Sequence, residues 1–168
     1  MKPSVSIIMG STSDLPVMEK AAAFLDKLMI PFEMNALSAH RTPSEVEQFA
    51  RGAAERGIKV IIAAAGMAAA LPGVIAANTC LPVIGVPIKG MLDGLDAMLS
   101  IIQMPPGIPV ATVGVNGALN AAILAAQILS LGDSELADRL AAEKEGLKDK
   151  IVKANEELSQ VKYNYKTN

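Results

Sequence analysis

The sequence predicts an α/β fold, a three-layer αβα sandwich with a five-stranded parallel sheet and a long C-terminal helix. Short apolar runs of strand length alternate along the chain with segments whose apolar residues recur at helical spacing. Most of these runs are apolar on both faces, as expected for parallel strands that are covered by helices on both sides. Residues 1–168 are therefore predicted to form a single domain.

Five apolar runs are the expected strands. They cover residues 5–10, 32–37, 59–65, 81–86 and 108–115. The first run, "VSIIMG", is interrupted only by Ser6, and its apolar side chains need helices above and below the sheet.

Two loops between strands and helices carry helix-start signals. After the first strand, Ser13 is predicted to cap a helix over residues 14–28. After the second strand, Thr42 and Glu45 form the pattern of a capping box, with Pro43 at the first helical position. Each of the two helices should therefore begin directly after a strand.

The C-terminal segment, residues 133–162, is predicted to be a long amphipathic helix with a candidate break at Gly146. Its apolar stripe can fold back on its own domain or pack on a neighbouring subunit. The second interpretation is favoured, because a stripe of this length would otherwise stay exposed to water.

Composition excludes several classes of protein. With 51% apolar and 19% charged residues, the chain is not of the disordered class. The net charge is −2, there is no tryptophan, and no basic run is interleaved with aromatic residues, which argues against nucleic-acid binding. The single cysteine, Cys80, can form no internal disulfide and is expected to pack among apolar neighbours, which suits the reducing cytoplasm.

Residues 60–88 contain no charged residue and are long enough to span a bilayer. Three prolines and three glycines interrupt this segment, and a helix exposed to lipid could not satisfy the backbone groups that such breaks free. We therefore expect buried strands here and no membrane insertion.

Function in an open parallel sheet is expected in the loops at the carboxyl ends of the strands. The first such loop is "GSTSD", where hydroxyls and free amides could hold a phosphate and Asp14 could accept hydrogen bonds from a ribose. The same residues could equally serve as a simple helix cap. The loop lacks the glycine patterns of dinucleotide and ATP sites, so neither cofactor is expected.

The second loop, "SAHRTP", holds the only histidine of the chain, His40. His40 and Arg41 could be solvated residues beside a helix start, or a proton carrier next to a cation for phosphate or carboxylate. The local sequence leaves both interpretations open. A lone histidine without nearby ligand clusters does not make a zinc site, so no metal is expected.

Two further segments are weaker candidates. "AAAGMAAALPG", residues 63–73, has small side chains that would let a ligand approach the backbone, or let helices pack closely. Asn116 and Asn120, after the fifth strand, could donate to a ligand or cap a helix.

Taken together, the motifs resemble those of the PurE family. The resemblance covers about residues 5–131 and rests on "MGSTSD", "LSAHRTP", "LPG", "LPVIGVP" and "LDGLDAMLSIIQMPPGIPVATVGVNGALNAAILAAQIL" in this order. It implies a flavodoxin-like fold, a homo-octamer, a small ribonucleotide substrate, and no metal or organic cofactor. It also implies a mutase reaction of purine (IMP) biosynthesis, in which a carboxylate moves from the exocyclic amine of an aminoimidazole ribonucleotide to ring carbon 4.

The resemblance also implies roles for individual residues. The family's proton-transferring histidine matches His40, and its phosphate-binding arginine matches Arg41. Four further residues of the same two loops are expected to contact the substrate, the last two as weaker candidates: Ser11, Asp14, Ser13 and Ser38.

The chain departs from the family pattern in "AAAGMAAALPG". Most members resemble "AGAGGAAHLPG" there, so Ala64 and Met67 stand where glycine is usual, and Ala70 stands where a second histidine is usual. A carboxylase that uses free carbon dioxide remains an alternative, although such members typically have lysine where this chain has Arg41. A non-catalytic nucleotide-binding module is the alternative from another class.

Overall fold

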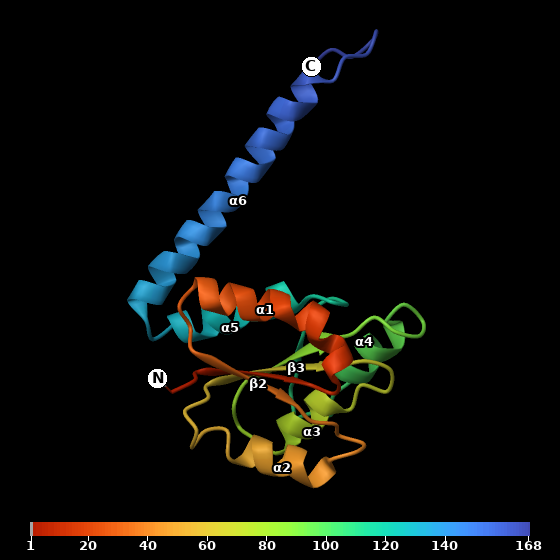
Figure 1. Ribbon diagram of the computed structural model, residues 1–168, viewed down its shortest axis with the longest axis vertical. Helices are drawn as coiled ribbons and strands as arrows, with labels where there is room; N and C mark the ends of the chain where they lie inside the picture. The colour runs from red at the N-terminus through yellow and green to blue at the C-terminus, as the bar shows by residue number, and fades with distance from the viewer. Residues whose placement is uncertain (1) are drawn as a thin grey trace.

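The computed structural model describes residues 2–168 and has a parallel sheet between two layers of helices (Figure 1). The order of strands across the sheet is β2-β1-β3-β4-β5. The strands are β1 (Val5–Met9), β2 (Phe32–Ala36), β3 (Val60–Ala65), β4 (Val83–Pro87) and β5 (Ala111–Thr112). Every neighbouring pair runs parallel, which confirms the predicted fold class.

Helices cover both faces of this sheet. Each connection between strands that are consecutive in the chain carries a helix, which is the usual crossover between parallel strands. The helices are α1 (Leu15–Lys27), α2 (Pro43–Arg51), α3 (Leu71–Ala77), α4 (Leu95–Ile102), α5 (Ala118–Ser130) and α6 (Ser134–Gln160), with a short 3-10 helix, η1 (Thr12–Asp14), before α1. In Figure 1, α1 and α5 lie on one side of the sheet, and α2 and α3 lie on the other.

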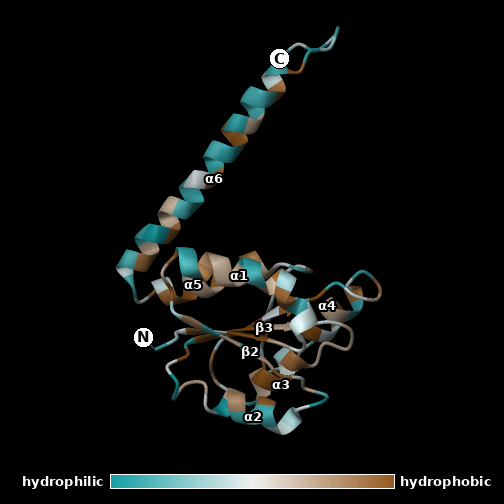
Figure 2. Ribbon diagram, in the orientation of Figure 1, coloured by the Kyte–Doolittle hydropathy of each residue, from teal (hydrophilic) through white to brown (hydrophobic). Residues whose placement is uncertain are grey.

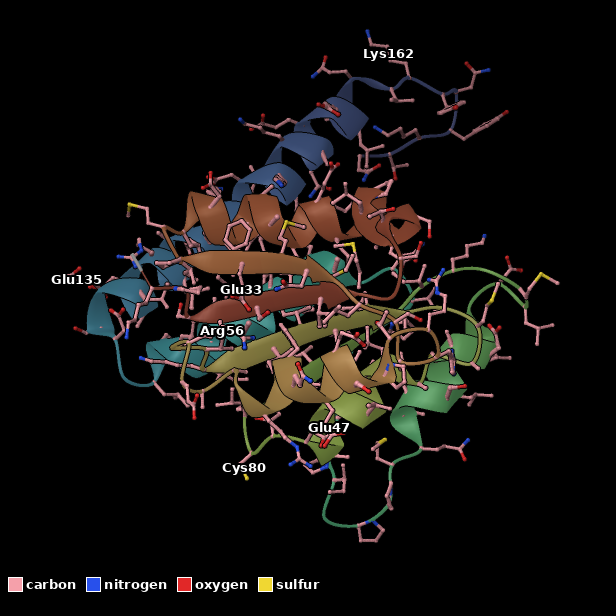
Figure 3. All side chains as sticks on the ribbon, turned by 60° about the horizontal axis from the view of Figure 1, so that its bottom comes forward. Glu33, Glu47, Arg56, Cys80, Glu135 and Lys162 are labelled. Atoms are coloured by element: carbon pink, nitrogen blue, oxygen red, sulfur yellow. The ribbon has the colours of Figure 1, made fainter. Side chains whose placement is uncertain are left out.

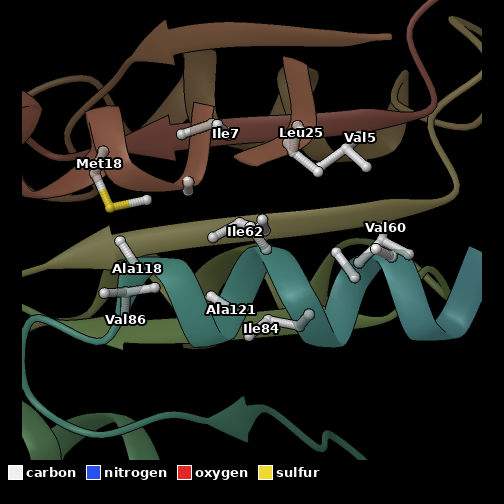
Figure 4. Close-up of a cluster of buried hydrophobic side chains, with 14 of the residues drawn as sticks. Val5, Ile7, Met18, Leu25, Val60, Ile62, Ile84, Val86, Ala118 and Ala121 are labelled. Atoms are coloured by element: carbon white, nitrogen blue, oxygen red, sulfur yellow. The ribbon is translucent and has the colours of Figure 1, made fainter. Parts of the chain in front are cut away.

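The core has two halves because side chains alternate across each strand. Val5 and Ile7 of β1 pack with α1 and α5 in one cluster (Figure 4). Ile8, between Ile7 and Met9, packs with α2, α3 and α4 in the other cluster. All five residues of β1 are buried, as its apolar run predicts.

The polar exception in β1, Ser6, is buried and fully partnered. Its hydroxyl donates to Glu33 Oε1 at 2.9 Å, directly across the β1–β2 register. The same oxygen accepts from Arg56 Nη2 at 3.1 Å, and the Arg56 guanidinium lies 4.7 Å from the centre of the Phe49 ring. Figure 3 labels Glu33 and Arg56 in this network, which ties β1, β2 and α2 together.

The fifth strand is shorter than predicted, with two residues where the sequence suggests 108–115. Pro109 has no N–H to donate to a ladder, and β5 lies at the edge of the sheet. Beyond β5, Asn116 turns out of the strand with a φ of 56° while its N–H donates to the Pro87 carbonyl at 2.8 Å.

Two predicted caps are wrong. Asp14, not Ser13, precedes α1, and its side chain makes no capping hydrogen bond. Thr42 does precede α2, with Pro43 at the first helical position, but its side chain makes no capping bond either. The Thr42 hydroxyl is instead used inside the loop before the helix, as described below.

The uncharged segment 60–88 forms β3, α3 and β4 inside the sandwich. Among residues 2–168, no helix is both long enough and apolar enough to cross a membrane. Cys80, in the loop before β4, is a free thiol and is exposed, so the expectation that it packs among apolar neighbours is wrong.

Helix α6 is continuous through Gly146 and projects away from the sandwich (Figure 1). Only the first turns of α6 contact the sandwich: Leu136 is buried, and Lys27 pairs with Glu143 at 2.7 Å. Farther along, Leu147 and Ile151 are 56% and 65% exposed. Figure 2 shows brown apolar bands along this otherwise hydrophilic helix, so a long apolar stripe has no partner within the described chain.

Candidate active site

A cavity of about 660 Å³ opens at the carboxyl ends of β1, β2, β3 and β4. The loops that follow these four strands line it, because parallel strands bring their carboxyl ends to one edge of the sheet. All six predicted site residues line this cavity: Ser11, Ser13, Asp14, Ser38, His40 and Arg41. The structure thus brings together two loops that the sequence separates.

The loop after β1 places a carboxylate inside the cavity wall. The Ser11 hydroxyl accepts from the Ser13 N–H at 3.3 Å, which turns the chain into η1. The Ser13 hydroxyl in turn donates to Asp14 Oδ1 at 3.2 Å. Asp14 itself is only 9% exposed.

Burial sets the ionisation of Asp14. Loss of water around the carboxylate raises the pKa of Asp14 above its ordinary value of 3.8, while hydrogen bonds from the Ser13 side chain and the Ser11 backbone act in the opposite direction. The Asp14 carboxylate lines the cavity and can accept a further hydrogen bond from a donor there. A ribose hydroxyl is such a donor.

The loop after β2 is organised around Ser38. Thr42 Oγ1 accepts from the Ser38 N–H at 2.9 Å and donates to the Ser38 carbonyl at 3.1 Å. The Ser38 hydroxyl accepts from the Arg41 N–H at 3.2 Å. These bonds close a tight turn that presents His40 and Arg41, both exposed, at the cavity.

Arg41 joins the two loops. Its Nη2 donates to the Gly10 carbonyl at 2.9 Å, at the end of β1. This bond holds the guanidinium at the start of the loop that carries Ser11 and Ser13, and its other N–H groups can bind an anion. Phosphate and carboxylate are the anions whose geometry matches the N–H groups of a guanidinium.

The loop after β3 forms a wall of small residues with a strained backbone. Met67 and Ala69 have φ values of 55° and 36°, in the left-handed region. Each such residue costs about 1–2 kcal/mol, because its Cβ approaches the following carbonyl oxygen. Ala70, which stands where the resemblance places a histidine, precedes α3 and carries no polar group toward the cavity.

The loop after β4 adds Ile88, Lys89 and Gly90, which sequence reasoning missed. A signal was available, because these residues follow a buried strand just as the other three loops do. Asn116 does not cap a helix and lies outside the cavity lining, and its Oδ1 accepts from the Lys89 N–H at 2.9 Å. Asn120 is exposed on α5 and lies outside the cavity lining.

Metal ligands do not gather in the described chain. Within residues 2–168, no group of three or more His, Cys, Asp or Glu side chains is placed to hold a metal ion.

The sequence matches the family model described as AIR carboxylase over residues 4–150. The chain belongs to the AIR carboxylase family. This membership confirms the resemblance that the loop motifs indicate, because the match covers β1 to β5 and all four loops of the cavity.

Members of this family include close relatives that carry the mutase name. An N5-carboxyaminoimidazole ribonucleotide mutase from Pyrococcus abyssi is 59% identical over 147 residues, which cover 87% of this chain and 84% of the relative. The enzyme of the same name from Thermotoga maritima is 52% identical and covers 96% and 95%. A phosphoribosylaminoimidazole carboxylase from Saccharomyces cerevisiae is 55% identical, but the match covers only 25% of that much longer protein.

Solved structures of the family share the fold. The crystal structure of Treponema denticola PurE has a TM-score of 0.83 at 34% identity, with 94% of this chain and 99% of that one covered. A PurE2 variant from the same organism has a TM-score of 0.85 at 33% identity and covers 95% and 100%. The sandwich with its long C-terminal helix is therefore a family architecture.

We predict opposite effects of Asp14→Asn on stability and on binding. A carboxyl whose pKa is raised by folding loses stability as pH rises from 3.8 to the raised value, so the charged Asp14 costs stability at neutral pH. The variant should melt at a higher temperature at pH 7, and this gain should shrink as pH falls through that interval. Nucleotide binding should weaken about tenfold or more, because a bond to a charged acceptor is lost.

Thermal melts at several pH values measure the effect on stability, and titration calorimetry with aminoimidazole ribonucleotide measures the effect on binding. Asp26→Asn is the matched control, because Asp26 is exposed on α1, the helix that follows Asp14. This variant should change neither the melting temperature nor nucleotide binding. A variant less stable than the wild type at pH 7 would contradict the burial argument.

Proposed function

We propose that this protein is an N5-carboxyaminoimidazole ribonucleotide mutase, an isomerase of purine biosynthesis that forms 4-carboxy-5-aminoimidazole ribonucleotide. The observation that carries the proposal is that relatives named for this mutase match the chain at 52–59% identity over most of both lengths. The cavity supports it, because it gathers an anion-binding guanidinium, a ribose acceptor and a histidine.

Substrate binding follows from the two organised loops. Arg41, held by the Gly10 carbonyl, binds the phosphate together with the hydroxyls of Ser11, Ser13 and Ser38. Asp14 accepts hydrogen bonds from the ribose hydroxyls. The imidazole then extends from β1 toward the small residues that follow β3, because β3 is the next strand in the sheet.

His40 is the catalytic residue in this proposal and moves one proton twice. The exocyclic carbamate loses carbon dioxide as its nitrogen takes a proton from His40, which leaves the aminoimidazole. Carbon 4 then attacks the trapped carbon dioxide, and the proton displaced from carbon 4 returns to His40. The enzyme ends in its starting protonation state, as an isomerase must.

Carbon dioxide must stay in the cavity between the two steps. The wall after β3 is built from Ala65, Gly66 and Ala68, which offer no polar group that would hold water against the gas. No cofactor is needed for this chemistry, because the ring itself supplies the electrons that form the new carbon–carbon bond.

The purified protein should convert N5-carboxyaminoimidazole ribonucleotide to the 4-carboxylate without ATP. A competition assay measures which source of carboxylate is used. The carboxylated substrate carries a label in its carboxylate, and it is mixed with unlabelled aminoimidazole ribonucleotide and bicarbonate. Turnover of the free aminoimidazole with bicarbonate, and no turnover of the carboxylated substrate, would assign the carboxylase reaction instead. Binding of both nucleotides without turnover would leave a non-catalytic binding module.

His40→Asn should abolish turnover, by at least about a hundredfold, because it removes the proton carrier. Binding of the 4-carboxylate product should change little, since the imidazole is exposed and the loop is closed by Ser38 and Thr42. Steady-state kinetics and calorimetry on one preparation separate these effects. Normal turnover in the variant would refute the role of His40.

We further propose that the protein works in the cytoplasm as a homo-octamer, in which residues 133–162 pack on a neighbouring subunit. The unpartnered stripe of α6 supports this assembly, because apolar helix faces of this length are stable when covered. The octamer number itself comes from the family resemblance.

Light scattering should therefore give a mass several times that of the 17.5 kDa chain. Ile151→Glu places a charge in the exposed stripe of α6 and should shift the protein toward smaller species. Lys153→Glu changes charge on the same helix outside the stripe and serves as the control. A monomeric wild type would refute the packing of α6 on a neighbour.

A further inference from the structure

We propose that Lys89 binds the carboxylate that the enzyme transfers, at the opposite end of the cavity from the phosphate. This inference rests on the proposed function for the identity of the substrate. It concerns a residue to which neither the motifs nor the comparisons assign a role.

The lining of the cavity carries few charged side chains. The ribonucleotide carries a phosphate at one end and a carboxylate at the other, and both need a counter-charge. Among the described residues that line the cavity, Arg41 and Lys89 are the basic ones, apart from His40. Asp14, between them, is the acidic one.

The order of the strands arranges these charged residues along one row. Arg41 follows β2, Asp14 follows β1, and Lys89 follows β4, so the loops that carry the two cations lie at opposite ends of the row β2-β1-β3-β4, with Arg41 Nη2 reaching the Gly10 carbonyl after β1. Adjacent strands are about 4.8 Å apart, so three steps separate these loops by roughly 14 Å. A nucleotide laid along this row, with its phosphate at Arg41 and its ribose at Asp14, points its ring toward Lys89.

The serine hydroxyls of the cavity gather at the Arg41 end. Ser11, Ser13 and Ser38 all lie in the loops after β1 and β2, where a phosphate needs several donors. The wall around Lys89 is apolar, with Ala65, Gly66 and the buried Ile88. Among the described lining residues, Lys89 offers an ammonium group at this end of the cavity, and one ammonium group suits one carboxylate.

The loop holds Lys89 in place. Its N–H donates to Asn116 Oδ1 at 2.9 Å, and the Asn116 N–H donates to the Pro87 carbonyl at 2.8 Å, so the backbone after β4 is fastened to the loop after β5. The Lys89 ammonium lies 3.0 Å from Asp93 Oδ1. Both side chains of this pair are exposed, so the pair is weak and yields to a substrate carboxylate.

Two nucleotides that differ only in the carboxylate provide the test. They are aminoimidazole ribonucleotide and its 4-carboxylate, and calorimetry gives the Kd of each for the full-length wild type and for Lys89→Met. We expect the variant to bind the 4-carboxylate at least about tenfold more weakly and to bind the uncarboxylated nucleotide as the wild type does. Lys89→Arg should restore most of the lost affinity, because it keeps the cation.

Lys59→Met is the matched control. Lys59 is exposed and precedes β3, so it lies at the amino ends of the strands, away from the cavity, and its loss changes the net charge equally. Equal weakening of both nucleotides by Lys89→Met would place Lys89 at the phosphate and overturn the proposal. Unchanged affinity for the 4-carboxylate would overturn it as well. Wild-type turnover in the same preparation tests the proposed mutase function separately, because the Kd comparison needs no turnover.

Discussion

The direction of the strands is the constraint on which the rest of this structure depends. Because the paired strands run parallel, the carboxyl ends of β1 to β4 meet at one edge, and four loops distant in the sequence line one cavity. Parallel pairing in turn needs a helix after each strand, and these helices bury the sheet from both sides. The core and the site are thus two results of one arrangement.

The site carries costs that the core offsets. Asp14 is a largely buried carboxyl whose pKa is raised by burial, and Met67 and Ala69 hold left-handed backbone conformations in the cavity wall. Two apolar clusters, one on each face of the sheet, contribute the stability that offsets these unfavourable features. Ser6 shows the contrasting case away from the cavity, where a buried polar group has its partner within the chain.

Sequence patterns predicted the strands and the loops after β1 and β2, because these features depend on local chemistry. Apolar runs bounded by turn residues mark strands, and the loops that follow them mark His40 and Arg41 as site candidates. The Thr42 cap was predicted wrongly because the backbone of Ser38 competes for the same hydroxyl. Lys89 was missed because no motif accompanies it, although its position directly after a buried strand places it at the same edge of the sheet as the other three loops.

The bond from Arg41 Nη2 to the Gly10 carbonyl has a consequence for how selectively the cavity recognises its ligand. A free arginine side chain samples many rotamers, and an incoming anion would have to freeze them. Here folding has already restricted that motion, so less conformational entropy is lost when the ligand arrives. The guanidinium also stands at a set position, so it discriminates by distance, and anions of the wrong length for the cavity gain little from it.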